Sequence, residues 1–287
     1  MRIAKNWKDF EILDTTQGEK LERWGEFLLI RPDPQIIWTP EKSPIWQKAA
    51  ASYRRSNSGG GEWQYRKKLP EGWTVDYDKL RFHIRPTGFK HTGLFPEQAV
   101  NWDYMSDKIK AAGRPIRVLN LFAYTGGATL ACAAAGASVC HVDASKGMVS
   151  WARENAALAG LSDRPIRWII EDCKKFVERE LRRGSTYDAI LMDPPSYGRG
   201  PTGEVWKLES AVYELVALCA GLLSENPLFF LLNSYTTGLS PSVMEYILGI
   251  LLQKRMTGTL SSAEIGLPVS ASGMNLPCGS TAIWERD

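Results

Sequence analysis

From residue 116 onward, apolar segments of strand length alternate with amphipathic segments of helix length, and this alternation constrains the fold more than any other feature. The pattern predicts strands at residues 116–122, 138–143, 166–170, 187–192 and 228–233. It predicts helices at residues 127–135, 146–159, 174–183, 208–223 and 242–252. Five strand–helix repeats are typical of a parallel sheet covered on both faces, so we predict a doubly wound α/β fold.

Both ends of the chain depart from this pattern. Residues 258–262 and 281–286 resemble two further strands, separated by a Gly-, Pro- and Ser-rich stretch at 266–280, and we expect an antiparallel edge to the sheet there. Residues 10–38 and 63–85 show short β-like alternation, and residues 53–62 predict a mobile basic loop. We therefore expect a small β-rich accessory region, residues 1–80, and a main domain, residues 81–287.

The composition argues against membrane, secreted and metal-binding classes. No apolar run is long enough for a signal peptide or a transmembrane helix, which predicts a soluble cytoplasmic protein. The five cysteines are scattered without a C-x-x-C pair, so we expect neither a metal site nor a disulfide framework.

Basic residues and tryptophans are concentrated in the first 114 residues. This part holds 20 Lys and Arg against 15 Asp and Glu, and seven of the 11 tryptophans. Cations interleaved with aromatic rings suit a polyanion whose bases can stack, which indicates RNA. A small β-domain with an aromatic core and a solvated basic face explains the same pattern equally well.

The predicted strand at 116–122 leads into a glycine turn, Ala123-Tyr124-Thr125-Gly126-Gly127, and then into a helix of small residues. Such a turn lets a ligand approach the backbone at the carboxyl end of a strand. The segment lacks the G-x-G-x-x-G pattern, which disfavours nicotinamide and flavin cofactors. An ordinary strand-to-helix turn remains an alternative.

Acidic residues follow the next two predicted strands. Asp143 comes 17 residues after Gly126, near the spacing at which a carboxylate accepts hydrogen bonds from ribose hydroxyls. Glu171 and Asp172 follow the third strand, where a carboxylate could accept a hydrogen bond from an adenine amino group. Each acid alone could be a helix N-cap, but their recurrence after successive strands favours a nucleoside site.

The fourth predicted strand ends in Asp193-Pro194-Pro195-Ser196-Tyr197. Two prolines fix φ and remove two backbone donors, so the chain stays extended and its carbonyls could form a rigid acceptor rim for a planar base. Tyr197 is a candidate stacking partner, with buried packing as the alternative. The glycine-containing segment 198–207 is interpreted as a loop that closes over the base or as a plain connector.

In order and spacing, residues 120–127, Asp143, Asp172 and 193–197 resemble the motifs of class I S-adenosylmethionine-dependent methyltransferases, which have a Rossmann-like sheet. Together with residues 89–98, they resemble the bacterial family that methylates guanine N7 or cytosine C5 in large-subunit ribosomal RNA. This resemblance covers about residues 82–284 and implies catalytic residues Asp193, Pro194, Pro195, Ser196 and Tyr197. It implies an S-adenosylmethionine site formed by Gln98, Asn120, Phe122, Ala123, Tyr124, Thr125, Gly126, Asp143, Ala144, Ser145, Asp172 and Cys173.

One departure concerns the target atom. Methylation at cytosine C5 normally needs a cysteine thiolate that attacks the ring first, and neither residues 193–197 nor residues 233–238 contain a cysteine. A base nitrogen offers a lone pair, so alignment with the methyl donor is enough. We therefore expect methyl transfer to a base nitrogen. The alternatives are a small-molecule methyltransferase and a noncatalytic RNA-binding protein of ribosome assembly that keeps a cofactor pocket.

Overall fold

The structure is a computed structural model that describes residues 1–56, 60–88, 90–199, 205–236 and 238–287. The described chain forms two compact units. The first contains residues 1–2, 100–265 and 278–287, and the second contains residues 3–99 and 266–277. The second unit therefore includes residues 81–99, which the expected division at residue 80 assigns to the main domain. Each unit is described by itself.

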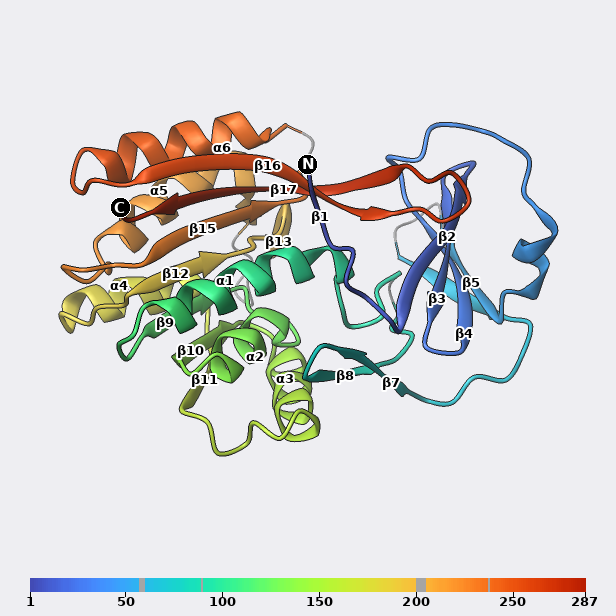
Figure 1. Cartoon of the computed structure of the whole chain (residues 1–287), viewed down its shortest axis with the longest axis horizontal. Helices are drawn as coiled ribbons and strands as arrows, with labels where there is room; N and C mark the ends of the chain where they lie inside the picture. Colours follow the sequence, from blue (N-terminus) through green and yellow to red (C-terminus); the bar gives the residue numbers. More distant parts are fainter. Residues whose placement is uncertain (57–59, 89, 200–204, 237) are drawn as a thin grey trace. The chain divides into compact units, whose positions relative to one another are not determined.

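An eight-stranded sheet forms the centre of the first unit, in the order β1-β16-β17-β15-β12-β9-β10-β11 (Figure 1). Five strands run parallel to one another: β9 (Arg117–Leu121), β10 (Ser138–Asp143), β11 (Ile166–Ile170), β12 (Ala189–Met192) and β15 (Phe229–Ser234). They match the five predicted strands, and the bounds of β10 and β11 are the predicted ones. The doubly wound α/β prediction is confirmed.

The expected antiparallel edge is present, but its strands are much longer than predicted. β16 covers Thr259–Pro268 and β17 covers Asn275–Glu285, and β17 pairs antiparallel with β15. The prediction that residues 266–280 form a connecting stretch was therefore wrong at both of its ends. Pairing with a neighbouring strand satisfies the backbone of this Gly- and Pro-containing sequence, and local composition does not show that pairing. A short strand, β1 (Arg2–Ile3), completes the edge.

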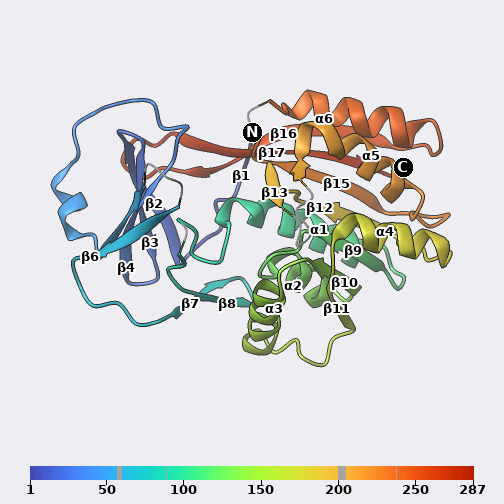
Figure 2. The same ribbon diagram turned by 180° about the vertical axis from the view of Figure 1, so that it is seen from behind.

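Helices cover both faces of this sheet (Figures 1 and 2). α1 (Ala99–Ala111), α2 (Gly127–Ala134) and α3 (Lys146–Leu158) lie on one face, and α4 (Cys173–Arg182), α5 (Leu208–Ala220) and α6 (Pro241–Leu248) lie on the other. An apolar core lies under the second group, where Phe176, Leu215 and Met244 pack together with strand residues such as Leu119 and Phe230. A π-helical turn at Gly249–Gln253 extends α6.

The second unit is rich in β-structure, as expected for the N-terminal region. A five-stranded sheet has the order β2 (Phe10–Thr16), β3 (Glu19–Trp24), β4 (Phe27–Pro32), β5 (Ala51–Arg55) and β6 (Gly61–Tyr65). A separate hairpin pairs β7 (Trp73–Tyr77) with β8 (Leu80–Ile84), and two short 3-10 helices lie at Pro44–Lys48 and Pro96–Gln98. The predicted basic loop at 53–62 is instead largely the β5–β6 hairpin, and residues 57–59 lie outside the described residues.

The tryptophans of the second unit have structural roles. Trp24 and Trp46 are buried, and their indole N–H groups donate to Glu22 and Asp14. The indole groups of Trp7, Trp38, Trp63 and Trp73 likewise donate to backbone carbonyls within the unit. Of the two interpretations of the tryptophan-rich N-terminal region, the aromatic core therefore accounts for Trp24 and Trp46.

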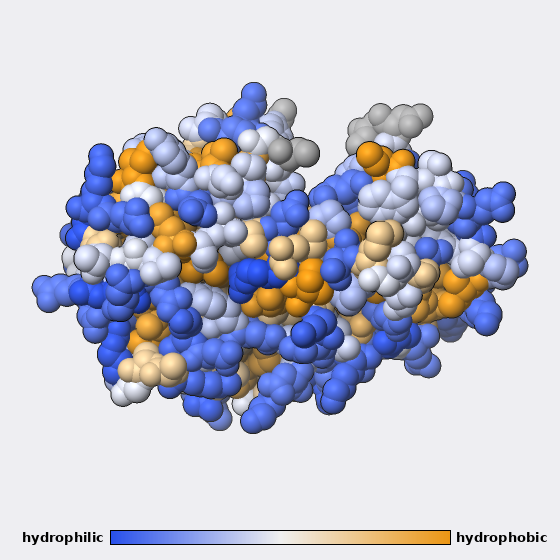
Figure 3. Space-filling view, turned by 45° about the horizontal axis from the view of Figure 1, so that its top comes forward, coloured by the Kyte–Doolittle hydropathy of each residue, from blue (hydrophilic) through white to orange (hydrophobic). Residues whose placement is uncertain are grey.

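On the face drawn in Figure 3, hydrophobic residues form several patches separated by hydrophilic ones. Every helix among the described residues falls short of the length and apolar character needed to cross a bilayer.

Candidate functional site

The strand order reverses beside β9, which makes the carboxyl ends of β9 and β12 the place to look for a ligand site. From β9 the chain continues to β10 and β11 on one side, and then crosses to β12 and β15 on the other. In open α/β sheets, ligands bind outside the carboxyl ends of the strands at such a reversal. The segments singled out from the sequence follow these strand ends directly.

The turn after β9 has an unusual backbone. Phe122 and Tyr124 have positive φ angles of 55° and 51°, and Gly126 follows with a φ of 89°. Residues other than glycine rarely adopt this conformation, and such strain is typically retained at ligand sites. Two hydrogen bonds fix the turn to the core: Ala123 N donates to Val142 O, and Phe122 N donates to the buried thiol sulfur of Cys173. Cys173 therefore contacts the turn from within the core.

Packing explains the two glycines that start α2. A Cβ atom on Gly126 would lie 3.0 Å from Ala152 Cβ, and one on Gly127 would lie 2.5 Å from Cζ2 of Trp102 on α1. The close packing of α1 and α3 against this helix start depends on both glycines. It fixes the position at which the turn and the first free amides of α2 emerge from the sheet.

Asp143 at the end of β10 joins this turn to the next one. Its Oδ2 accepts a hydrogen bond of 2.9 Å from Tyr124 N, and its Oδ1 accepts one of 2.8 Å from Ser145 N. Burial raises the pKa of Asp143, and the two backbone donors partly offset that effect. A carboxylate has about four acceptor positions, so each oxygen keeps capacity for one ribose hydroxyl. Ala144 and Ser145 are exposed beside it, and Ser145 caps α3.

Asp172 at the end of β11 is the N-cap of α4. Its Oδ1 accepts a hydrogen bond from Lys175 N at 2.9 Å, and the residue is exposed. The neighbouring Glu171 forms an ion pair with Arg179. Asp172 can be a helix cap and a ligand residue at the same time, because a capping carboxylate retains acceptor positions for an adenine amino group.

The other predicted cofactor residues lie at different depths. Asn120 is buried, and its Nδ2 donates to Thr129 Oγ1, which is itself 2.9 Å from Nδ1 of His141. Thr125 is also buried, and its carbonyl accepts from Asn155 Nδ2. Gln98 belongs to the second unit, where it ends the 3-10 helix Pro96–Gln98.

The diproline segment forms a rim at the end of β12. Asp193 accepts a hydrogen bond of 2.9 Å on Oδ1 from Asn233 Nδ2, and Ser196 Oγ accepts one of 2.5 Å from Thr236. The Pro195 carbonyl accepts a hydrogen bond of 2.6 Å from the indole N–H of Trp206. The sequence suggested that this carbonyl faces a ligand, but it already has a partner within the protein. Tyr197 is 51% exposed, which excludes the buried-packing alternative for its side chain.

Two short strands, one before and one after residues 200–204, pair with each other. β13 (Tyr197–Arg199) pairs antiparallel with β14 (Val205–Lys207), and residues 200–204 lie outside the described residues. Trp206 on β14 lies 5.6 Å from the Phe122 ring, centroid to centroid. Trp206 is not among the residues predicted from the sequence, although a tryptophan within a glycine-containing segment is a usable signal.

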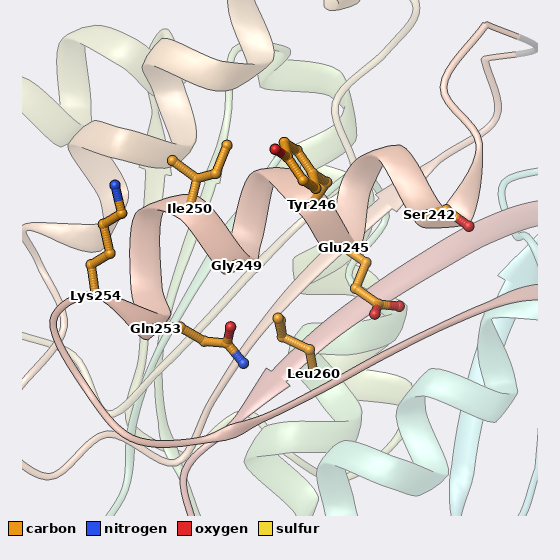
Figure 4. A pocket seen from close by; sticks show the side chains of 8 residues that line it. All are labelled: Ser242, Glu245, Tyr246, Gly249, Ile250, Gln253, Lys254 and Leu260. Atoms are coloured by element: carbon orange, nitrogen blue, oxygen red, sulfur yellow. The ribbon is translucent and has the colours of Figure 1, made fainter.

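A groove of about 450 Å³ in the first unit contains none of the predicted site residues. Its lining comes from α6, the π-turn and β16: Ser242, Glu245, Tyr246, Gly249, Ile250, Gln253, Lys254 and Leu260 (Figure 4). Within the described residues, no three His, Cys, Asp or Glu side chains come together in a way that could hold a metal ion. The candidate site is therefore the rim formed by the turns after β9, β10, β11 and β12.

The rim fits a nucleoside with an attached polar chain. It offers the two carboxylates Asp143 and Asp172 on adjacent strand ends, a strained turn that brings the backbone close to a ligand, and the exposed Tyr197 beside Asp193. Carboxylates accept hydrogen bonds from a diol and an amino group, as S-adenosylmethionine presents them. A diphosphate would instead meet like charge at Asp143 and Asp172.

Comparison with known proteins identifies a family for the chain. The model of the S-adenosylmethionine-dependent methyltransferase family matches residues 43–218. The chain is 32% identical over 199 residues to the ribosomal RNA large subunit methyltransferase K/L of Shewanella frigidimarina, covering 69% of this chain and 25% of that protein. It is 35% identical over 156 residues, or 53% of its length, to the K/L enzyme of Shewanella sp. strain MR-4, of which it covers 21%. The chain thus spans about a quarter of the length of these curated relatives.

Solved structures extend the similarity over the whole chain. The S-adenosylmethionine-dependent methyltransferase from Agrobacterium tumefaciens superposes with a TM-score of 0.93 at 39% identity, covering 99% of this chain and 92% of that one. SMU.776, solved in complex with S-adenosylhomocysteine, superposes with a TM-score of 0.76 at 18% identity, covering 97% and 76% of the two chains, and shows the shared fold. Taken together with the family match, these similarities show that the chain belongs to the S-adenosylmethionine-dependent methyltransferase family and that S-adenosylmethionine is its cofactor.

Proposed function

We propose that this enzyme methylates a base nitrogen in ribosomal RNA. The observation that carries the proposal is the rim after β12, where Asp193 is held by Asn233 and followed by two prolines and the exposed ring of Tyr197. A rigid acceptor edge beside an accessible ring suits a flat heterocycle that is turned out of an RNA strand. The K/L relatives, whose names specify large-subunit ribosomal RNA, support RNA as the substrate class.

Each part of the rim has a defined task in this proposal. When bound, S-adenosylmethionine supplies a methyl group activated by a sulfonium. Asp143 holds the ribose hydroxyls and Asp172 the adenine amino group, while the turn from Phe122 to Gly126 packs along the ligand. Asp193 and the Pro194 region orient the target base so that its nitrogen lone pair is in line with the methyl group. Tyr197 stacks on the base.

The cysteines support a base nitrogen over cytosine C5 as the target. All five, Cys132, Cys140, Cys173, Cys219 and Cys278, are buried. Burial raises the pKa of Cys132 to about 12 and that of Cys140 to about 11, and it raises the pKa of Cys173 as well. A covalent C5 mechanism needs an accessible thiolate, which no cysteine of the chain provides in this structure.

Exposed cations on the β5–β6 hairpin of the second unit support an RNA contact there. Arg54 and Arg55 are the last two residues of β5, and Lys67 and Lys68 follow the end of β6. All four side chains are exposed. The ring of Tyr65, the last residue of β6, is 57% exposed. Cations that track a phosphate backbone beside an accessible aromatic ring are typical of single-stranded RNA binding. We propose that this accessory region binds the RNA around the target base.

The test uses an unmodified large-subunit ribosomal RNA transcript and S-adenosylmethionine with a radiolabelled methyl group. After nuclease digestion, mass spectrometry should place the label on a ring or exocyclic nitrogen. Asp193→Ala should retain S-adenosylhomocysteine binding and lose transfer. Label at cytosine C5 would overturn the nitrogen assignment. Label that is already in small molecules of a cell extract before any ribonuclease is added would favour a small-molecule substrate. Absence of transfer to any RNA would favour a noncatalytic RNA-binding role.

A further inference from the structure

A continuous series of side-chain hydrogen bonds connects Arg2 to Asp193 within the first unit. Arg2 Nη1 donates to Asn101 Oδ1 at 2.7 Å, and Asn101 Nδ2 donates to Thr281 Oγ1 at 3.1 Å. The Thr281 hydroxyl donates to Asn233 Oδ1 at 2.7 Å, and Asn233 Nδ2 donates to Asp193 Oδ1 at 2.9 Å. We call this series the Arg2–Asp193 chain.

The Arg2–Asp193 chain lies in the interior. Asn101, Thr281 and Asn233 are each 1% exposed, and Thr281 and Asn233 are directly paired across β17 and β15. Buried amides and hydroxyls destabilise a protein unless they are satisfied, so apolar residues would be the simpler choice at these positions. Three consecutive buried polar residues that end at a candidate catalytic carboxylate therefore need an explanation beyond packing.

All four hydrogen bonds run in one direction, from the cation to the anion. Each middle residue accepts from the Arg2 side and donates toward Asp193. This order fixes which way both asparagine amides and the threonine hydroxyl point, because reversing one group would place donor against donor. Bonds aligned in one direction polarise one another in the low-dielectric interior, and the bonds at the charged ends are the strongest.

The Arg2 end of the chain is anchored. Its second guanidinium nitrogen donates to the carbonyl of Val100 at 3.1 Å, and the guanidinium lies 5.5 Å from the ring centroid of Tyr104. The chain thereby joins β1, α1, β17 and β15 to the turn after β12. Rotation of the Asp193 carboxylate would break the bond to Asn233 and leave a buried amide without its acceptor, which opposes that rotation.

We propose that Arg2, Asn101, Thr281 and Asn233 are positioning residues that fix the orientation of the Asp193 carboxylate toward the target base. This inference rests on the proposed function, because it is there that Asp193 contacts the base. The chain contributes to methyl transfer by holding the acceptor in its productive geometry before the base arrives, so its loss lowers kcat rather than cofactor affinity.

The decisive variant is Thr281→Val, which removes the hydroxyl while keeping the branched shape. It interrupts the chain two bonds away from Asp193. We expect kcat on the ribosomal RNA transcript to fall about tenfold, while the Kd for S-adenosylhomocysteine stays at the wild-type value. Thr281→Ser restores the hydroxyl and should recover most of the kcat.

Tyr104→Phe is the matched control. The Tyr104 hydroxyl donates to Glu285 at 2.9 Å and so also joins α1 to β17, but it is not a member of the chain. Both variants should lower the Tm. If Thr281→Val and Tyr104→Phe lower the Tm and both keep wild-type kcat, the chain is only structural and the proposal is wrong.

A measurement without RNA separates this proposal from the proposed function. In protein labelled with 15N-asparagine, the Nδ2 protons of Asn233 should be protected from exchange in the wild type and in Tyr104→Phe, and exposed to exchange in Thr281→Val. If wild-type protein binds S-adenosylhomocysteine but methylates no RNA, the proposed function fails. Unchanged Asn233 protection in Thr281→Val overturns the positioning role, whatever the substrate is.

Discussion

The carboxylate of Asp143 accepts a hydrogen bond of 2.9 Å from the backbone nitrogen of Tyr124, whose φ angle is 51°. The acid at the end of β10 thus stabilises the strained turn after β9. A second backbone donor, Ser145 N, binds the other oxygen of Asp143. The same side chain therefore shapes the cofactor turn and supplies the acceptors proposed for the ribose, so the two roles should be lost together.

Asp143→Asn should weaken both stability and S-adenosylhomocysteine binding. An asparagine has one acceptor oxygen, so either Tyr124 N or Ser145 N loses its partner, at a cost of about 1–3 kcal/mol in the free energy of unfolding. Calorimetry should show that the affinity for S-adenosylhomocysteine falls about tenfold or more, because one charge-assisted acceptor is lost. Wild-type affinity in this variant would remove Asp143 from the ribose site.

Asp172→Asn should separate cofactor binding from helix capping. Asparagine is as good an N-cap as aspartate, so the bond from Lys175 N and the Tm should be preserved. The remaining acceptor oxygen is lost, and the affinity for S-adenosylhomocysteine should fall about tenfold because the adenine amino group loses its partner. Asp172→Ala, which removes both functions, serves as the comparison. If Asp172→Asn binds like the wild type, this residue is only a cap.

The regular part of the fold could be predicted from local sequence because it depends on local periodicity. The strand bounds of β10 and β11 follow from apolar runs bounded by turns, and the glycine turn at Gly126 follows from its backbone requirement. The length of β16 and β17 could not be predicted, since a Gly- and Pro-containing segment becomes a strand only through its pairing partner. Local composition carries no record of that partner.

Within the candidate site, the sequence points to residues next to each strand end and gives no signal for residues that reach the rim through long-range contacts. Asp193 is visible in its diproline motif, whereas Thr281 and Asn101 enter the Arg2–Asp193 chain through contacts between residues 180 positions apart. Trp206 was missed because its role depends on the pairing of β13 with β14, which brings its indole to the Pro195 carbonyl.

Glu22→Gln should strongly destabilise the second unit. Glu22 is 0% exposed and binds the buried Arg31 through both carboxylate oxygens, at 2.5 Å and 2.8 Å. Removing its charge leaves the buried Arg31 guanidinium without its hydrogen-bonded ion-pair partner, which costs about 3–5 kcal/mol. Glu11→Gln is the control, because its pair with Arg23 is partly exposed and should contribute only about 0–1 kcal/mol. Urea unfolding followed by tryptophan fluorescence measures both.

The Glu22 contribution should also depend on pH. Burial alone would raise the pKa of Glu22, but the positive charges of Arg31 and Lys20 and the bonds from Arg31 and Trp24 outweigh it and lower the pKa to about 2 from its ordinary 4.5. A lowered folded-state pKa stabilises the protein fully above pH 4.5, and this stabilisation is lost as pH falls from 4.5 toward 2. The difference between wild type and Glu22→Gln should shrink across that window. A difference that is the same at pH 7 and pH 3 would contradict this.

Gly126→Ala should damage the cofactor turn through two separate effects. At a φ of 89° an alanine is strained by about 1–2 kcal/mol, and its Cβ would lie 3.0 Å from Ala152 Cβ and 3.1 Å from Leu130 Cδ1. The steric contact with Ala152 pushes the turn away from α3 and should lower the affinity for S-adenosylhomocysteine. Gly160→Ala isolates the first effect, because Gly160 also has a positive φ, 68°, but a Cβ there meets no atom within 4 Å. Both variants should lower the Tm, and only Gly126→Ala should weaken binding. Equal binding by the two variants would show that packing of the turn against α3 does not shape the cofactor site.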